Sequence, residues 1–423
     1  MYENMKKNIL LCAILCMQVY YAKSQTNISA ELRPRLIIDD GYKSPKIKDN
    51  NTVPYITQRT RLNVNKKSDL LDAYISIQDI RYWGDEDNYK SSGALSNTKS
   101  LDLNEAWFKY KPSDLLTFKI GRQIFKYDDQ RIISSRGWND YQVKYDALLF
   151  VYQDSLNKLD LGISYNSETN KNLLYPENKF RTFDFIRYER LLNNFTISAI
   201  SVITGNTTSD TTEAITLKGT HGANLNYKYK YSKVRISGYY QHNLDKKQKD
   251  VSAYSISFYV TQKINNKIKI GTGIDYLSGQ DENNGLDYQN TNHAFDILYG
   301  RRHGWYGYMD YFSTMPEQGL QDYMIKSEFK IVKNTTCQID YHHFQLAADK
   351  INPDLVDKVI NRNLGDEIDF TIVWNPIKEM TLQAGYSFYL LTKSTGIIKG
   401  IDNKNARFPQ FFYTMITISP KIL

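Results

Sequence analysis

Two pairs of arginines near the N-terminus stand at alternate positions of the chain. Arg33 and Arg35 form the first pair, and Arg59 and Arg61 form the second. Alternate residues of a β-strand share a face, so each pair would present two guanidinium groups side by side. Guanidinium groups fork onto carboxylates, and several of them around a narrow passage concentrate anions. The spacing favours either a binding path for an anionic solute or a wall stiffened by arginine–carboxylate pairs.

The later part of the chain adds cations to the same polar face. These are Arg235, Lys269 and Lys326, and they share the face with carboxylates of Glu31, Glu105, Asp275, Glu328 and Glu367. Because both signs are present and the formal net charge is only +8, the solute path and the stiffened wall both stay open. The charge is also too dispersed to predict nucleic-acid binding, which needs a concentrated basic patch.

No residue pattern predicts catalysis or a resident metal. Asp128 and Asp129 are neighbours, as are His342 and His343, so in strands the members of each pair point to opposite faces. Acid–base pairs and metal centres both need side chains that converge. The sequence also has no nucleophile elbow and no phosphate-binding glycine loop. We therefore expect a protein that is not an enzyme and that carries no cofactor or metal.

The elements that would position the cations are strands with one apolar face. Leu32 and Leu36 alternate with Arg33 and Arg35, which predicts that the leucines face lipid. Only every second residue of a membrane-spanning strand must be apolar, which suits a chain that is 41% hydrophobic. The 34 tyrosines also suit strands and the aromatic girdles at membrane interfaces. A soluble, tyrosine-rich β-sandwich is the alternative.

Short and long connections alternate along the chain. Polar turns such as Lys111–Asp114 and Lys230–Ser232 separate longer stretches such as Gly84–Ser100 and Lys126–Tyr141. An up-and-down barrel has this layout, with short periplasmic turns and long extracellular loops. The fold class predicted is all-β: a single closed antiparallel transmembrane β-barrel of about 18 strands, formed by residues 25–423.

The stretch Gly279–Gly319 leaves the strand number open. His293–Tyr299 and Trp305–Phe312 look strand-like, and the number becomes about 20 if both cross the membrane. We prefer one long outer connection, because Arg301–Gly304 is an awkward tight turn. Its aromatic residues would either fold into the lumen and narrow it, or pack on neighbouring outer loops.

Residues 1–24 have the order of a secretory signal peptide. Lys6 and Lys7 precede the short apolar run Ile9–Met17, and Ala22-Lys23-Ser24 has the small-x-small form of a cleavage site. Two of the three cysteines lie in this segment, so Cys337 is left alone and no disulfide framework is expected.

Five short elements between residues 101 and 152 resemble the signature of the alginate-export family of outer-membrane β-barrels. They are Glu105-Ala-Trp107, Gly121-Arg122-Gln123, Tyr127-Asp-Asp129-Gln-Arg131, Trp138-Asn139 and Asp146-Ala-Leu148. The resemblance implies passage of an anionic polysaccharide across the outer membrane of a Gram-negative bacterium. It extends the candidate lumen residues to Glu105, Arg122, Gln123, Asp129, Arg131, Arg136, Trp138 and Asp146.

Strand parity disagrees with the resemblance at one of these residues. Arg122 shares a face with Phe118 and Ile120, which alternation assigns to lipid. A lumen position for Arg122 therefore requires a bulge near Gly121 or the end of the lipid belt there.

The function predicted is an outer-membrane channel for an anionic polysaccharide or oligosaccharide with an Arg- and Lys-lined lumen. The alternative is a general porin, or one for small anions or sugars, with no polymer specificity. The expected partners are outer-membrane lipid and lipopolysaccharide, an anionic saccharide solute and periplasmic export proteins. The sequence assigns neither the solute nor the direction of transport.

Overall fold

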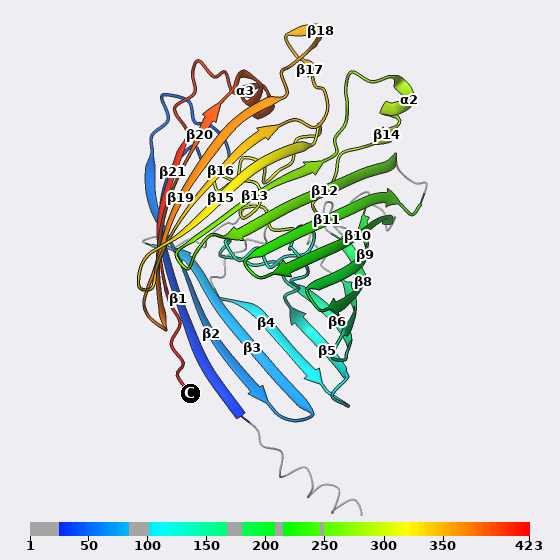
Figure 1. Ribbon diagram of the computed structural model, residues 1–423, viewed down its shortest axis with the longest axis vertical. Helices are drawn as coiled ribbons and strands as arrows, with labels where there is room; N and C mark the ends of the chain where they lie inside the picture. Colours follow the sequence, from blue (N-terminus) through cyan, green and yellow to red (C-terminus); the bar gives the residue numbers. More distant parts are fainter. Residues whose placement is uncertain (1–24, 84–100, 167–179, 208–214, 246–248) are drawn as a thin grey trace, which may run out of the picture.

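The computed structural model describes residues 25–83, 101–166, 180–207, 215–245 and 249–423. Within them, 18 antiparallel strands follow one another around a barrel (Figure 1). The ring closes because β1 pairs with β21 as well as with β2. The strands are β1 (Gln25–Asp40), β2 (Val53–Lys67), β3 (Leu71–Tyr82), β4 (Leu101–Tyr110), β5 (Leu116–Gln123), β6 (Tyr145–Gln153), β7 (Asn157–Tyr165), β8 (Phe180–Leu192), β9 (Phe195–Thr207), β10 (Ile215–Tyr229), β11 (Ser232–Asn243), β12 (Asp250–Lys263), β13 (Ile268–Leu277), β15 (Leu320–Val332), β16 (Thr335–Gln345), β19 (Asn363–Ile377), β20 (Met380–Leu391) and β21 (Gln410–Ile418).

The prediction of a single closed antiparallel barrel is confirmed, and the strand number is 18. β13 pairs directly with β15, with Leu277 opposite Leu320, so the stretch between them is one connection. Neither His293–Tyr299 nor Trp305–Phe312 is a barrel strand. The proposed signal peptide lies outside the described residues and stays a prediction.

The long connections carry five small elements. They are α2 (Leu286–Gln289), β14 (Thr291–Asn292), β17 (Ile351–Asn352), β18 (Leu355–Val359) and α3 (Lys393–Lys399). β14 pairs in parallel with the start of β12, and β17 and β18 form a separate hairpin. Both helices are short, and no described helix has the length and apolar character needed to cross a bilayer. In barrels of this kind the short turns face the periplasm and the long connections face outward.

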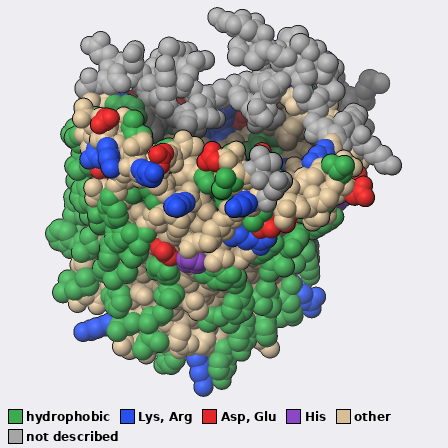
Figure 2. Space-filling view, turned by 90° about the horizontal axis from the view of Figure 1, so that it is seen from above, with side chains coloured by type: hydrophobic (Ala, Val, Ile, Leu, Met, Phe, Trp, Pro, Cys, Tyr) green, Lys and Arg blue, Asp and Glu red, His purple; other side chains and the backbone are tan. Residues whose placement is uncertain are grey.

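Apolar side chains cover the outer wall of the barrel. Leu32, Ile75, Ile120 and Ile256 are exposed on strands whose alternate residues are buried inside. Figure 2 shows hydrophobic side chains over much of one face, with a band of charged residues along one border. An apolar belt bounded by charge is the surface that a bilayer requires, so burial of the alternate residues defines a lumen.

Glycines let aromatic rings lie flat against the inner wall on neighbouring strands. In four cross-strand pairs the glycine stands directly opposite the ring that covers it: Gly162 and Phe185, Gly222 and Tyr239, Gly273 and Tyr259, and Gly385 and Tyr413. A Cβ atom on Gly385 would lie 2.2 Å from a carbon of the Tyr413 ring, closer than atoms can pack. These contacts fix ring positions inside the barrel.

Replacing Gly385 with valine is expected to lower the free energy of unfolding by about 1–3 kcal/mol, the usual cost of overpacking. The displaced ring is Tyr413, which is fully buried and whose hydroxyl accepts a hydrogen bond from Gln383 at 2.6 Å. Urea unfolding in detergent micelles measures the change. Gly285→Val is the control, because nothing lies within 4 Å of a Cβ atom there. Equal urea midpoints of unfolding for both variants would show that the contact between Gly385 and the Tyr413 ring does not stabilise the barrel.

Two connections fold into the lumen and together form a plug. We call residues 124–144, between β5 and β6, the first inner loop, and residues 293–319, before β15, the second inner loop. They meet in a short parallel bridge between Ile133 and Tyr299. The backbone N–H groups of Ser134 and Tyr299 donate to the carbonyls of Tyr299 and Ile132, each at 3.1 Å. Both loops lie within the ring of strands in Figure 1.

The second inner loop is seated by the wall strands β16, β19 and β20. The backbone N–H of Met309 donates to the Glu367 carboxylate at 2.7 Å. Tyr311 stacks on Tyr389 with ring centroids 4.3 Å apart, and Phe312 lies 4.6 Å from Phe344. Of the two arrangements left open for this stretch, the structure therefore places the aromatic part in the lumen. The earlier part, with α2, stays outside it.

Candidate functional site

The four arginines of β1 and β2 face the lumen, where the first inner loop covers them. Asp140 of that loop accepts from Arg33 Nη2 at 2.5 Å and from Arg35 Nη2 at 3.1 Å. Arg33 also donates to the Gly137 carbonyl, and Arg35 to the Trp138 carbonyl, each at 3.0 Å. Burial alone would raise the pKa of Asp140, but the charges of Arg35 and Arg33 outweigh it and hold that pKa below its usual value.

Arg59 and Arg61 are engaged in the same way. Arg59 pairs with Glu31 at 2.6 Å, and Arg61 donates to the side-chain oxygens of Gln78 and Gln142 at 2.8 and 2.9 Å. All four arginines are only 4–8% exposed. In this arrangement the four arginines connect the wall to the plug. This agrees with a stiffened wall, one of the two interpretations of their spacing, rather than with a binding path for an anionic solute.

The other end of the first inner loop is attached to the opposite wall. Arg131 pairs with Asp275 of β13 at 2.5 Å and with Asp129 of its own loop at 2.9 Å. Asp129 in turn accepts from Ser237 of β11 at 2.8 Å. Burial disfavours the charged guanidinium, but Asp275 and Asp129 outweigh it and raise the pKa of Arg131. The loop thus crosses the lumen from β1 and β2 to β11 and β13.

Arg136 and Trp138 join the two inner loops to each other. Arg136 donates to the Leu298 carbonyl at 2.8 Å and to the Gly300 carbonyl at 3.1 Å. Trp138 stacks on His303, with ring centroids 4.0 Å apart and planes 8° from parallel. Both side chains therefore help to hold the plug together, although each stays partly exposed.

Arg122 and Asp146 do not line the lumen, and this corrects the expectation drawn from the resemblance. They pair across β5 and β6 at 2.8 Å, with side chains 35% and 61% exposed on the outer wall. The reason is strand register: Gly121 and Gln123 stand opposite Ala147 and Tyr145, so the residues between them must face outward. Gly121 has φ +121°, but the pairing stays in register across it and no side chain changes face.

Glu105 and Gln123 keep the inward parity expected for them. The Glu105 carboxylate accepts from the indole N–H of Trp107 at 3.3 Å, and the Gln123 amide donates to the Ala147 carbonyl at 2.9 Å. Together with Lys119 and Asp160 they line a cavity of about 490 Å³ beside β4–β7.

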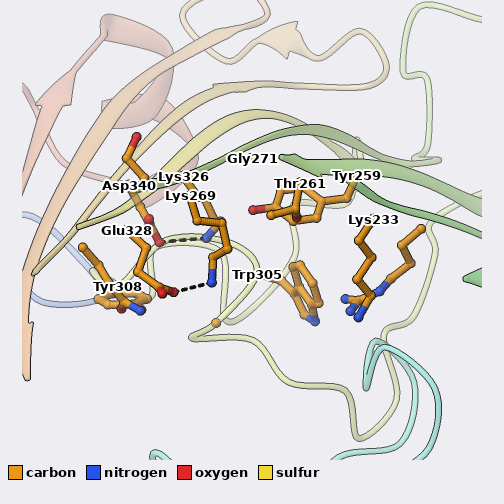
Figure 3. Close-up of a pocket in the computed structure, with 14 residues that line it drawn as sticks. Lys233, Tyr259, Thr261, Lys269, Gly271, Trp305, Tyr308, Lys326, Glu328 and Asp340 are labelled. Atoms are coloured by element: carbon orange, nitrogen blue, oxygen red, sulfur yellow. Dashed lines mark hydrogen bonds and ion pairs between the residues drawn. The ribbon is translucent and has the colours of Figure 1, made fainter. Parts of the chain in front are cut away.

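A second cavity, which we call the cationic vestibule, lies between strands β11–β16 and the second inner loop (Figure 3). Its volume is about 360 Å³. Its wall carries four cations, Lys233, Arg235, Lys269 and Lys326, and two carboxylates, Glu328 and Asp340. Lys233 and Lys269 stand one residue from the starts of β11 and β13, next to short turns, so the vestibule belongs to the periplasmic half of the lumen.

The cations of the vestibule differ in how they are paired. Lys269 pairs with Glu328, and Lys326 with Asp340 at 3.2 Å, as the dashed lines in Figure 3 mark. Arg235 donates to the Asn226 side chain at 3.2 Å. The Lys233 ammonium has no hydrogen bond or ion pair with any residue that the structure describes. It is therefore the cation most available to an anion that enters.

Aromatic rings also line the vestibule. Trp305 and Tyr308 come from the second inner loop and Tyr259 from β12. Trp305 donates its indole N–H to the Asp129 carbonyl at 3.0 Å, and its ring lies 4.0 Å from the Arg131 guanidinium carbon. Rings beside ammonium groups suit a ligand with an apolar face and a carboxylate.

Sequence reasoning missed two of the residues that matter most here. Asp140 holds two arginines but lies in a loop, where no periodicity shows which way a side chain points. Lys233 stands two residues before Arg235 on the same strand, so the parity that selected Arg235 would also have selected Lys233.

Comparison with known proteins supports this assignment of the fold and adds a family match. Residues 26–166 match the model of the alginate export family. The matched region runs from β1 through β7 and includes the first inner loop and all four wall arginines. The resemblance to the alginate-export family seen in the sequence is thereby confirmed over this region. No curated protein matches the chain.

Several solved outer-membrane structures share the barrel across its length. OccK11 (OpdR) of Pseudomonas aeruginosa superposes with a TM-score of 0.62 at 12% identity, covering 94% of this chain and 96% of that one. OccAB4 of Acinetobacter baumannii gives 0.60 at 12% identity, covering 94% and 98%. OpdK of P. aeruginosa, solved with vanillate, gives 0.60 at 10% identity, covering 94% and 99%. The protein is an outer-membrane β-barrel with the fold of these structures.

Proposed function

We propose that this channel passes anionic saccharides, and that the cationic vestibule is where such a solute binds. The proposal rests on Lys233, whose ammonium group has no partner among the residues that the structure describes. This group lies beside Arg235 and the aromatic residues of the vestibule. With four cations against two carboxylates, the cavity wall has a formal excess of two positive charges. Low-dielectric walls focus such a field and raise the local concentration of anions.

The candidate cations then have two different roles. Arg235, Lys269 and Lys326, with Lys233, form the solute site. Arg33, Arg35, Arg59 and Arg61 act as struts that hold the plug, because each already donates to loop or wall oxygens. They become available to a solute only if the first inner loop moves.

The size of the vestibule favours short saccharides in the plugged state. Pockets of roughly 300–1,000 Å³ hold ligands of drug size, so about 360 Å³ gives room for one or two sugar units. A longer polyanion could thread the barrel only after the plug is displaced. Passage of a polysaccharide, as the alginate export family suggests, therefore requires a second conformation of the inner loops.

A porin for small anions is the second candidate. The plug favours it, since the outer half of the lumen is filled by buried residues such as Met309, Tyr311 and Phe312. The likeness to OpdK, which was solved with vanillate, also agrees with a small carboxylate as solute. The two candidates differ in whether the channel binds a uronate disaccharide more tightly than a single small carboxylate such as vanillate.

Replacing Lys233 with glutamine is expected to weaken block of the ion current by a uronate disaccharide about tenfold or more. A hydrogen bond to a charged group contributes about 1.5–3 kcal/mol, and each 1.4 kcal/mol is tenfold in affinity. The measurement is titration of single-channel current with the disaccharide. Lys267→Gln, which removes the same charge from an exposed short turn, is the matched control. If both variants bind the disaccharide as the unaltered channel does, the vestibule is not the solute site.

A further inference from the structure

Two histidines on the outer wall face each other through the same ring nitrogen. His221 of β10 and His242 of β11 have their Nε2 atoms 3.0 Å apart. The strands are paired so that His221 stands opposite Tyr240 and His242 opposite Gly219. Tyr240 is 46% exposed on the outer wall, while the alternate residue Gln241 is fully buried inside. The pair therefore lies outside the lumen and is independent of the solute path.

The far nitrogen of each ring is already held by oxygen. His242 Nδ1 lies 3.0 Å from the Asn243 carbonyl, and His221 Nδ1 lies 2.9 Å from Ser201 Oγ. A carbonyl can only accept, so His242 carries its proton on Nδ1, and in the neutral ring its Nε2 presents a lone pair to His221. Ser201 can donate or accept, so it tolerates either tautomer of His221.

The backbone beneath the two rings leaves space for them to converge. Gly219 lies under both Nε2 atoms, and a Cβ atom there would stand 2.8 Å from His221 Nε2 and 3.2 Å from His242 Nε2. Any other residue would push the rings apart. Convergent nitrogens whose opposite N–H groups bind oxygen are the arrangement seen around metal-bound histidines.

We propose that His221 and His242 form a binding site for a divalent transition-metal ion such as Zn²⁺. Zinc–nitrogen bonds of 2.0–2.1 Å at a tetrahedral angle place the two nitrogens about 3.3–3.4 Å apart, so the present pair needs to open by only about 0.3 Å. On binding, the ion takes the Nε2 lone pair of each ring. The proton of His221 moves from Nε2 to Nδ1, where it donates to Ser201, so no net proton is released.

The site has two protein ligands and open positions for water. No third His, Cys, Asp or Glu joins these rings among the residues that the structure describes. The ion is therefore exchangeable and weaker than a four-ligand structural zinc. Two imidazoles select Zn²⁺, Ni²⁺ or Cu²⁺ over Ca²⁺ and Mg²⁺, which require oxygen ligands. Bound metal would link β10 to β11 near the outward end of β11.

Calorimetric titration of the tag-free, refolded full chain in detergent tests the site. We expect one Zn²⁺ per chain, no binding of Mg²⁺, and loss of the zinc isotherm in both His221→Gln and His242→Gln. His293→Gln is the matched control, because that ring stacks on Tyr288 and contacts the Ser252 carbonyl without a described histidine partner. Absence of zinc binding by the unaltered chain, or an intact isotherm in either His221→Gln or His242→Gln, would overturn the proposal.

A second measurement needs no substitution. A ligand that binds only the folded state stabilises it. Zn²⁺ should therefore raise the urea midpoint of the unaltered chain, and EDTA should reverse the rise. An unchanged midpoint at a zinc concentration that saturates the calorimetric isotherm would contradict a folded-state site.

Discussion

Removing the second inner loop is expected to raise the single-channel conductance several-fold. The variant replaces residues 281–316, which include α2, β14 and most of the second inner loop, with a two-residue turn. The barrel can tolerate this, because Leu277 and Leu320 are register partners and the Gln280 N–H already donates to the Glu317 carbonyl at 2.7 Å. The deletion removes Trp305, Tyr311 and the other aromatic residues that the second inner loop places in the lumen, so the current should rise with the cross-section that they vacate.

The control for this deletion is another long outer connection that does not enter the lumen. β17 and β18 form a hairpin that stands away from the barrel in Figure 1, and trimming residues 352–358 should leave the conductance as it was. Equal conductance in the deletion variant and the unaltered channel would mean that the second inner loop does not restrict the current.

Replacing Asp140 with alanine should have the largest effect of any single substitution in the plug. Its carboxylate is fully buried between Arg33 and Arg35, and removing one partner of a buried ion pair costs about 3–5 kcal/mol. We expect a loss of this size in the free energy of unfolding, together with a higher and noisier conductance as the first inner loop detaches. Urea unfolding and single-channel recording give the two readouts.

The matched control removes a partly exposed carboxylate. Asp349 pairs with Arg362 at 2.7 Å in an outer connection, with side chains 25% and 42% exposed, and such pairs contribute about 0–1 kcal/mol. Asp349→Ala should therefore change neither readout appreciably. If Asp140→Ala behaves like this control, the arginines do not depend on Asp140 to hold the plug.

The same ion pairs give the plug a pH dependence with a defined sign. The pKa of Asp140 is held below its usual value, so its contribution to stability is present above about pH 4. The contribution is lost as the pH falls through the folded-state pKa. Acid should therefore loosen the first inner loop in the unaltered channel, and the Asp140→Ala variant should lack this component of the acid response.

Most of the fold could be predicted from the alternation of apolar and polar residues along the strands. Lipid outside and polar groups inside enforce the period of two, which is why the sequence alone assigns Leu32 and Arg33 to opposite faces. The same rule placed Arg122 outward. The resemblance to a family motif argued for the lumen instead, and register proved the stronger constraint because Gly121 does not shift the pairing.

The plug could not be predicted to the same degree. Residues such as Asp140 and Trp305 lie in loops, whose path depends on contacts with residues far away in the chain. Trp305 meets Asp129, and Met309 meets Glu367, through pairings that no local pattern encodes. For the stretch between β13 and β15, the aromatic composition was evident from the sequence, but the side of the wall on which it packs was not.

The proposed site for an anionic saccharide lies in the periplasmic half of a plugged lumen. The most direct test is the side dependence of current block in a single oriented channel, using uronate oligomers of graded length. We expect block from the short-turn side, saturating at one or two sugar units, and little block from the side of the long connections. Equal block from both sides, or affinity that keeps rising with oligomer length while the plug is in place, would contradict it.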